Sequence, residues 1–224
     1  MEQFKGGLIV SCQAPADSPL HDPEVIAAMA QAAVQQGAAG LRIDSPAHIQ
    51  AVRTRLAAPI IGLWKQTIAG SEVYITPQFV HAAAVASAGA DIIAIDGTAR
   101  PRPREETLEA LIQRIHRELG RSVMADVDTL ENAMAAAAAG ADYVGTTLYG
   151  YTHQTRHLRP PGFELLSQMV GQLRIPVICE GGIGTPKQAR RALDLGAYTV
   201  VVGTAITGID TLVQQYVEGM SRGR

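Results

Sequence analysis

The sequence predicts an α/β protein in which a single closed (β/α)8 barrel, a TIM barrel, spans residues 1–224 as one domain. Three observations support this fold: short apolar runs alternate with helical segments along the whole chain, eight such pairs fit into 224 residues, and a short motif recurs about every 50 residues. Strict alternation of buried strands and helices indicates a parallel sheet covered on both faces, and eight units close a barrel.

An open, doubly wound sheet is the alternative that the same alternation allows. A dinucleotide site in that fold needs a Gly-x-Gly-x-x-Gly turn after the first strand, whereas the stretch from Ser11 to Pro15 contains no glycine. We therefore favour the closed barrel.

The recurring motif is a Gly-Ala pair that ends a helical segment and precedes an apolar run. Its glycines are Gly37, Gly89, Gly140 and Gly196. Glycine readily adopts the left-handed conformation that ends many helices. Each copy therefore marks the junction between a helix and the next strand.

Each strand is predicted from a short, nearly uncharged apolar run, as expected for strands buried on both faces. The eight predicted strands cover residues 7–13, 40–44, 59–65, 91–96, 122–127, 143–148, 176–181 and 199–204.

Eight helical segments separate and follow these strands. Several begin with Ser or Thr before Pro, as at Ser45, Thr76 and Thr185, which is a typical N-cap followed by proline in the first turn. The predicted helices cover residues 23–36, 46–55, 77–88, 105–118, 129–139, 163–172, 186–195 and 210–219.

Charge and composition exclude several classes of protein. The chain has 19 Lys plus Arg against 21 Asp plus Glu and no dense basic block, so we expect no nucleic-acid or anionic-membrane partner. No apolar run approaches the roughly 18 residues that cross a bilayer. Because the stretch from Met1 to Lys5 lacks the apolar segment of a secretory signal, we expect a cytoplasmic protein.

Cysteine and histidine usage argues against a metal or redox centre. The two cysteines, Cys12 and Cys179, lie inside apolar runs, and no histidine ends a predicted strand. Two cysteines are too few for a disulfide framework or a four-ligand zinc site. We expect no metal and no cofactor.

Polar residues gather where the predicted strands end, which is where TIM-barrel enzymes carry their active sites. We therefore predict an active site there. The residues at these ends are Ser11, Gln13, Arg42, Asp44, Lys65, Asp96, Asp126, Asp128, Thr146, Thr147, Glu180 and Thr204.

Lys65 and Glu180 are the strongest catalytic candidates, because each ends an otherwise apolar run and should point into, or lie at the rim of, a dry barrel. Burial would lower the pKa of a lysine and let it remove a proton from carbon. Asp44, Asp96 and Asp128 lie close to turns or helix starts, where we expect them to accept hydrogen bonds from free backbone N–H groups.

Glycine-rich turns after the last two strands predict a phosphate site. Backbone N–H groups at such turns and at helix starts commonly bind phosphate in barrels, although tight loops also need glycine for conformational reasons. The candidate phosphate-binding residues are Gly181, Gly182, Gly184, Gly203 and Thr204.

Two long loops have open roles. The loop 149–161 is long enough to be a lid, and we take Tyr151 on it as a substrate-binding candidate. The segment 100–104, with three arginines and two prolines, is either a second anion-attracting rim or a stiff, solvated loop.

Several strings together resemble the N-acetylmannosamine-6-phosphate 2-epimerase family, from the first predicted strand to the last. The strings are Ser11-Cys12-Gln13-Ala14, Lys65 followed by Gly70-Ser71-Glu72-Val73-Tyr74-Ile75-Thr76-Pro77, Asp96-Gly97-Thr98-Ala99-Arg100-Pro101-Arg102-Pro103, Asp126, Gly145-Thr146-Thr147-Leu148-Tyr149-Gly150-Tyr151-Thr152, and Glu180-Gly181.

The resemblance implies a bacterial TIM-barrel enzyme of amino-sugar and sialic acid catabolism, which interconverts N-acetylmannosamine 6-phosphate and N-acetylglucosamine 6-phosphate without cofactor or metal. It implies that Lys65 is the base at C2 and Glu180 its acidic partner. It further implies that the sugar is held by Gln13, Arg42, Asp126 and Thr147.

The chain departs from the family pattern at two positions. The family often has a basic residue after the Glu-Gly pair and another after the last strand, where this chain has Gly182 and Gly208. Part of the usual phosphate clamp is therefore expected to be missing, so phosphate should be held by backbone groups.

The chemistry also fits the residues without the family. Inversion at C2 of an open-chain aldose needs a base, a group that stabilises the enolate oxygen, and a proton on the other face. Either Lys65 alone moves the proton on both faces of C2, or Glu180 acts on the second face. The alternative functions are another sugar-phosphate epimerase or indole-pathway barrel, a Schiff-base lyase, or a regulatory module that binds a phosphosugar. A homodimer is a separate expectation for the oligomeric state.

Overall fold

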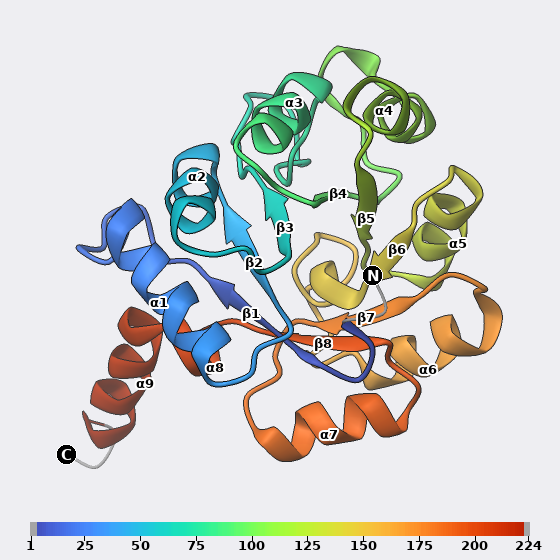
Figure 1. The fold of residues 1–224 in the computed structure, drawn as a ribbon. Coiled ribbons are helices and arrows are strands. Elements are labelled where there is room, and N and C mark those ends of the chain that lie inside the picture. Colours follow the sequence, from blue (N-terminus) through green and yellow to red (C-terminus); the bar gives the residue numbers. More distant parts are fainter. Residues whose placement is uncertain (1–3, 222–224) are drawn as a thin grey trace.

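Eight parallel strands close into a barrel in the computed structural model, which describes residues 4–221 (Figure 1). Each strand pairs with the next along the chain, and β8 pairs with β1 to complete the ring. The predicted closed (β/α)8 fold is confirmed. The strands are β1 (Leu8–Cys12), β2 (Gly40–Asp44), β3 (Ile60–Leu63), β4 (Ile92–Asp96), β5 (Ser122–Asp126), β6 (Tyr143–Gly145), β7 (Val177–Glu180) and β8 (Thr199–Val202).

Helices surround the barrel as an outer ring (Figure 1). Shorter helical turns also lie in the described part of the chain: η2 (Pro103–Glu105), η3 (Ile115–Leu119), which is π-helical and continues α4, and η4 (Thr146–Leu148). The α-helices are α1 (Pro23–Gln35), α2 (Pro46–Arg55), α3 (Phe79–Ser87), α4 (Leu108–Arg114), α5 (Leu130–Ala138), α6 (Phe163–Gln172), α7 (Pro186–Asp194), α8 (Thr204–Thr207) and α9 (Ile209–Ser221).

The core has two layers because side chains alternate between the two faces of each strand. On β4, Ile92 and Ala94 belong to the cluster inside the barrel, whereas Ile93 and Ile95 belong to the cluster between the barrel and the helices. All four are buried. This period of two also decides which polar residues at the strand ends face inward.

Helix α3 begins two residues later than predicted. Thr76 was expected as its N-cap, but it adopts a left-handed φ of 43° and its hydroxyl accepts the backbone N–H of Trp64. The helix begins at Phe79 after Gln78, which makes no side-chain cap bond. Thr76 therefore ties the preceding loop to the end of β3 instead of capping the helix.

The predicted helix 105–118 also begins later, because Thr107 caps α4 by accepting the N–H of Ala110. The last predicted helix, 210–219, is preceded by the separate short helix α8. Helix α9 then extends away from the barrel (Figure 1), and none of its residues is buried. Within residues 4–221, no helix is long and apolar enough to cross a membrane.

Candidate active site

Polar side chains enter the barrel interior at the C-terminal ends of the strands. Residues two apart on a strand share a face, so the interior residue Met124 of β5 is followed inside by Asp126, and Ile178 of β7 by Glu180. Arg42 on β2 reaches the same space, since its guanidinium contacts both carboxyl groups. The alternation of side chains along the strands thus brings charged groups from distant parts of the chain together inside the barrel.

Arg42, Asp126 and Glu180 form a buried ion-paired group. Arg42 is only 3% exposed, and its Nη2 lies 2.5 Å from Asp126 Oδ2 while its Nε lies 3.1 Å from Glu180 Oε1. The Thr147 hydroxyl joins both carboxyl groups, at 2.7 Å from Asp126 Oδ1 and 3.2 Å from Glu180 Oε2. A buried charge without a partner is very costly, so each of these groups holds the others in place.

Gly145 makes room for this arrangement. A Cβ at that position would lie 2.4 Å from Met124 Cε and 3.0 Å from Thr147 Oγ1. Only glycine therefore lets the Thr147 hydroxyl approach Asp126 from the end of β6.

One guanidinium serves two carboxyl groups, which controls their proton affinity. Burial raises the pKa of Glu180 to about 7, against the lowering effect of Arg42 and with a further rise from Asp126. Burial also raises the pKa of Asp126, despite its ion pair with Arg42. Burial would lower the pKa of Arg42, but the two carboxylates raise it above its ordinary value, so Arg42 stays charged. Glu180 thus exchanges a proton readily near neutral pH.

Lys65 lies at the edge of the same space. Strand β3 ends at Leu63, and the Lys65 side chain is 42% exposed. Of the two predicted positions, inside the barrel or at its rim, Lys65 occupies the rim. Its Nζ donates a hydrogen bond to Gln13 Oε1 and lies 3.7 Å from Asp44 Oδ2.

Gln13 connects Lys65 to the end of β1. Its amide oxygen accepts from Lys65 Nζ, and its Nε2 donates to the Ser11 hydroxyl at 3.0 Å. The ammonium or amine of Lys65 is thereby directed across the mouth of the barrel.

A cavity of about 630 Å³ opens over these groups. Its wall contains Gln13, Arg42, Lys65, Thr147 and Glu180. The structure thus brings together the two catalytic candidates and four of the five residues predicted to bind the sugar, since Tyr151 lines the cavity as well.

Tyr151 and Asp126, both predicted to bind the sugar, differ in whether they line the cavity. Tyr151 lines the cavity from the loop 149–161 and is 58% exposed. Asp126 is fully buried and does not line it. Asp126 holds Arg42 and Thr147, which do line the cavity, so its geometry is that of a group acting from behind the wall.

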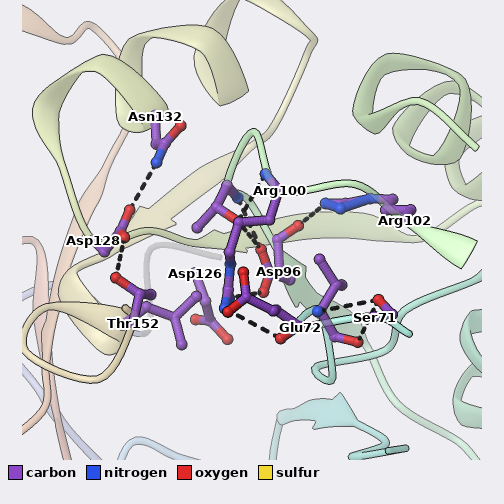
Figure 2. A network of polar contacts seen from close by, with 12 residues as sticks. Ser71, Glu72, Asp96, Arg100, Arg102, Asp126, Asp128, Asn132 and Thr152 are labelled. Carbon is purple, nitrogen blue, oxygen red and sulfur yellow. Dashed lines mark hydrogen bonds and ion pairs between the residues drawn. The ribbon is translucent and has the colours of Figure 1, made fainter. Parts of the chain in front are cut away.

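The remaining carboxylates at the strand ends are occupied within the protein, and Figure 2 shows Asp96 and Asp128 among them. Asp44 accepts the backbone N–H of Lys65 at 2.9 Å, and Asp96 that of Thr98 at 2.9 Å, as predicted. The same prediction is wrong for Asp128, whose carboxylate accepts from the side chains of Asn132 and Thr152, at 2.7 and 2.6 Å.

The loop 149–161 is anchored by this last contact. Thr152 and Thr155 are buried, and their hydroxyls lie 2.9 Å apart. The Thr155 hydroxyl also accepts the N–H of Gly150 at 3.1 Å. The predicted lid is in this structure a packed loop, from which Tyr151 alone among these residues reaches the cavity.

The candidate phosphate-binding residues Gly181, Gly182, Gly184, Gly203 and Thr204 all line the cavity. Gly182 has a φ of +70°, and a Cβ there would lie 2.5 Å from Pro160 Cβ. A side chain at Gly182 would collide with the end of the loop 149–161. This contact explains physically why the chain carries glycine where the family often has a basic residue.

Backbone N–H groups of the two turns differ in availability. Gln188 Oε1 accepts the N–H groups of Gly184 and Thr185, at 2.8 and 3.1 Å, as part of the capping box of α7. In contrast, the N–H groups of Gly181, Gly182, Gly203 and Thr204 have no hydrogen-bond partner among residues 4–221. The free backbone donors therefore include Gly182 after β7 and Gly203 after β8.

Gly208 is not an open position for a basic residue. A Cβ there would lie 2.8 Å from the Cα and carbonyl oxygen of Thr204. An arginine at this position would have to displace α8, whose N-terminus lines the cavity.

Sequence reasoning gave no role to several residues of the cavity wall. Tyr74 and Ile75 line it from the segment that follows β3, and Thr211, Leu212 and Gln215 line it from α9. The string Ser71 to Pro77 was noticed only for its resemblance. The sequence feature that could have revealed these wall residues is a tyrosine next to an isoleucine soon after the catalytic candidate Lys65.

Within the described part of the chain, no group of three or more His, Cys, Asp or Glu residues is arranged to hold a metal ion. The expectation that no metal or cofactor is needed stays a prediction.

The barrel and its rim define a class: a TIM-barrel enzyme with a lysine, a carboxyl group of near-neutral pKa and a fixed guanidinium over a cavity with free backbone donors. Comparison with known proteins narrows the class. The family model described as "Putative N-acetylmannosamine-6-phosphate epimerase" matches residues 26–222. The chain belongs to the N-acetylmannosamine-6-phosphate epimerase family.

Individual relatives agree with the family model. Proteins named "Putative N-acetylmannosamine-6-phosphate 2-epimerase" are 65% identical in Thermosynechococcus vestitus, over 97% of this chain and 95% of the relative, and 61% identical in Synechococcus elongatus, over 99% and 96%. The solved N-acetylmannosamine-6-phosphate 2-epimerase from Clostridium perfringens is 41% identical, covers 97% of this chain and 94% of its own, and superposes with a TM-score of 0.93.

Proposed function

We propose that this protein interconverts N-acetylmannosamine 6-phosphate and N-acetylglucosamine 6-phosphate, by removal and return of the proton at C2, in amino-sugar and sialic acid catabolism. The observation that carries the proposal is one cavity containing Lys65, Glu180 and Arg42. These three groups match the base, the acid and the electrophile that a C2 epimerisation requires.

Lys65 removes the C2 proton of the open-chain sugar when its amine is neutral. The electron pair of the C2–H bond forms a C1–C2 double bond, and the aldehyde oxygen takes the negative charge. Arg42 stabilises that oxygen, because its guanidinium is buried, charged and fixed by two carboxyl groups.

Glu180, in its protonated form, returns a proton to C2 from the opposite face. A pKa of about 7 supports this role, because it allows Glu180 to hold the proton and to release it near neutral pH. The step leaves Lys65 protonated and Glu180 ionised, and exchange with water restores both.

The sugar phosphate is held by backbone N–H groups of the glycine turns after β7 and β8. The free donors of Gly182 and Gly203 support this assignment, whereas Gly184 would have to compete with Gln188 for its N–H group. A site without arginine should bind phosphate less tightly than a bidentate guanidinium does.

Proton NMR of N-acetylmannosamine 6-phosphate with the protein in deuterium oxide tests the function. We expect the C2–H signal to disappear as signals of deuterated N-acetylglucosamine 6-phosphate rise. Binding without exchange at C2 would favour a regulatory module, and a product trapped on Lys65 by borohydride would favour a Schiff-base lyase.

The same measurement on Glu180→Gln tests the two-base route. We expect deuterium to enter N-acetylmannosamine 6-phosphate while epimer formation stops, because only the return from the second face is lost. Unchanged epimer formation would mean that Lys65 serves both faces.

The protein acts as a homodimer with a second copy of the chain seated on α9. Four large apolar side chains, Val213, Tyr216, Val217 and Met220, are exposed with the spacing of a single helix face, and Tyr216 is 74% exposed. An apolar cavity of about 410 Å³ lies nearby between α1 and α8, lined in part by Ile209. Light scattering of the wild type and of Val217→Glu tests this: the wild type should have twice the mass of the variant.

The cytoplasm is the compartment in which the enzyme works. The substrate supports this location, because a sugar phosphate carries charge that prevents it from crossing a membrane unaided.

A further inference from the structure

The segment from Ser71 to Thr76 lies against the ends of β3 and β4 and carries a part of the cavity wall that the proposed mechanism does not use. It runs antiparallel to the end of β3, with the Gln66 N–H donating to Tyr74 O and the Thr76 N–H to Trp64 O, both at 2.9 Å. The Asp96 N–H of β4 donates to Ile75 O at 3.0 Å. The segment is thus attached to two strands.

Arg100 fixes the outer half of this segment (Figure 2). Its Nη1 donates to Glu72 O at 3.1 Å, its Nη2 lies 2.5 Å from Asp96 Oδ2, and its Nε donates to the Thr98 hydroxyl at 3.0 Å. Arg102 donates to Asp96 O from the other side. The arginine-rich segment 100–104 is therefore neither a free anion-attracting rim nor a fully solvated loop, and two of its arginines hold the wall in place.

Tyr74 and Ile75 present a polar group and an apolar group to the cavity. Ile75 is buried in the barrel interior beside Leu63, and both line the cavity. Tyr74 is half-buried, and among residues 4–221 its hydroxyl has no hydrogen-bond partner. A half-buried phenol in a cavity wall usually finds a partner, so this hydroxyl is available to a ligand.

The order of the strands around the barrel places Tyr74 and Ile75 on the side of the cavity opposite the glycine turn after β7. In a closed barrel of eight consecutive strands, β3 lies directly opposite β7. The free N–H groups of Gly182 and Gly203 follow β7 and β8, whereas Leu63 and Tyr74 belong to the β3 side. Lys65, Arg42 and Glu180 line the cavity together with both sides.

A hexosamine 6-phosphate has groups at its two ends that fit the two sides of the cavity. Its phosphate is on C6, its reacting carbon is C2, and its acetamido group is attached to that same C2. If the phosphate lies at the glycine turns and C2 at Lys65, the acetamido group extends toward the β3 side.

We propose that Tyr74, with Leu63 and Ile75, is the subsite that recognises the acetamido group: the Tyr74 hydroxyl donates to the acetamido carbonyl oxygen, and the two aliphatic side chains contact its methyl group. This inference rests on the proposed function. A hydroxyl at C2 has neither the carbonyl oxygen nor the methyl group that these side chains would contact, so the subsite selects N-acetylhexosamine phosphates over plain hexose phosphates.

The electrostatic surroundings keep Tyr74 a donor. Burial raises the pKa of Tyr74, and the carboxylates of Asp126 and Asp96 raise it further, against smaller effects of Arg100 and Arg42. The phenol therefore stays protonated throughout the pH range in which the enzyme would work.

Comparison of Tyr74→Phe with the wild type on two ligands tests the proposal. For N-acetylmannosamine 6-phosphate we expect kcat/KM to fall about tenfold or more, mainly through KM, because one hydrogen bond to the substrate is lost. The inhibition constant of mannose 6-phosphate, which lacks the acetamido group, should stay within twofold. Tyr149→Phe is the matched control, because Tyr149 does not line the cavity.

Each other outcome overturns the inference. An equal loss of affinity for both ligands would mean that Tyr74 only supports the wall, and no loss for either would mean that its hydroxyl is idle. If the wild type fails to epimerise N-acetylmannosamine 6-phosphate at all, the proposed function itself is wrong, and that result precedes any comparison of variants.

Discussion

Lys65 is the residue on which the proposed chemistry most depends. We expect Lys65→Ala to lose about 100- to 10,000-fold in epimerisation rate, because a general base is removed. Circular dichroism should be unchanged, since the side chain is 42% exposed. Lys5→Ala is the control, because Lys5 is exposed and does not line this cavity. Activity of Lys65→Ala within tenfold of wild type would refute the assignment.

Glu180 should make stability depend on pH in a defined direction. Its folded-state pKa of about 7 lies above the ordinary value of 4.5, so the folded state binds the proton more tightly than the unfolded state. This contribution to stability is complete below the unfolded pKa and is lost as the pH rises through about 7. The free energy of unfolding should therefore fall between pH 5 and pH 8.

Glu180→Gln isolates that contribution, because glutamine keeps the shape of the protonated acid and does not titrate. Urea denaturation at pH 5 and pH 8 should show that the variant loses less stability over this interval than the wild type. Parallel losses in the two proteins would mean that the pKa of Glu180 is not raised by folding.

How well single residues were predicted depended on whether their role is local. Lys65 and Glu180 stood out because each follows an apolar run, and that signal lies within a few neighbouring residues. The exposure of Lys65 depends on pairing with the distant Ile75, and the position of Asp126 behind the wall depends on Arg42 from another strand. Such contacts across the barrel have no signature in one sequence, which is also why Tyr74 was missed.

Among the elements, the turn after β8 offers the cleanest test of phosphate binding. A Cβ on Gly203 meets nothing closer than Ser11 Cβ at 3.4 Å, so small side chains fit there. We expect Gly203→Asp to abolish most activity on the phosphorylated sugar through repulsion of the phosphate, whereas Gly203→Ala keeps most of it. Steady-state kinetics of both variants checks this, and equal activity would place the phosphate elsewhere.

The boundaries of elements were predictable where capping is local and not where a distant group intervenes. The capping box at Thr185 and Gln188 starts α7 as expected from sequence. The same Thr-Pro signature at Thr76 failed, because the hydroxyl of Thr76 is used by Trp64 at the end of β3. The loop 149–161 was expected to be a lid from its length alone, but burial of Thr152 against Asp128 packs it down.

The fold of the whole molecule was the most predictable level. Eight alternating units, with a Gly-Ala junction recurring about every 50 residues, define a ring whose strand ends must converge, and the observed barrel confirms this. What the sequence pattern could not give is the path of α9, because a helix that leaves the barrel has the same local pattern as one that packs on it.

Metal independence is a property of the whole enzyme and can be tested without any variant. Dialysis against a chelator and a thiol reductant should leave the epimerisation rate unchanged, because the proposed steps use only side chains and backbone groups. Activity that disappears on dialysis and returns with zinc or manganese would require a different mechanism.

Helix α9 contributes Leu212 and Gln215 to the cavity wall while its neighbours Val213 and Tyr216 face outward. If a second copy covers that outer face and thereby orders the cavity-lining side of α9, dimerisation strengthens ligand binding, and ligand binding strengthens dimerisation by the same factor. Specific activity should then decline as the enzyme is diluted below the dissociation constant of the dimer, and saturating mannose 6-phosphate should move that constant to lower protein concentration. Sedimentation equilibrium with and without the sugar phosphate would measure the shift in the dissociation constant of the dimer. Total enzyme activity would then rise more steeply than in proportion to the enzyme concentration.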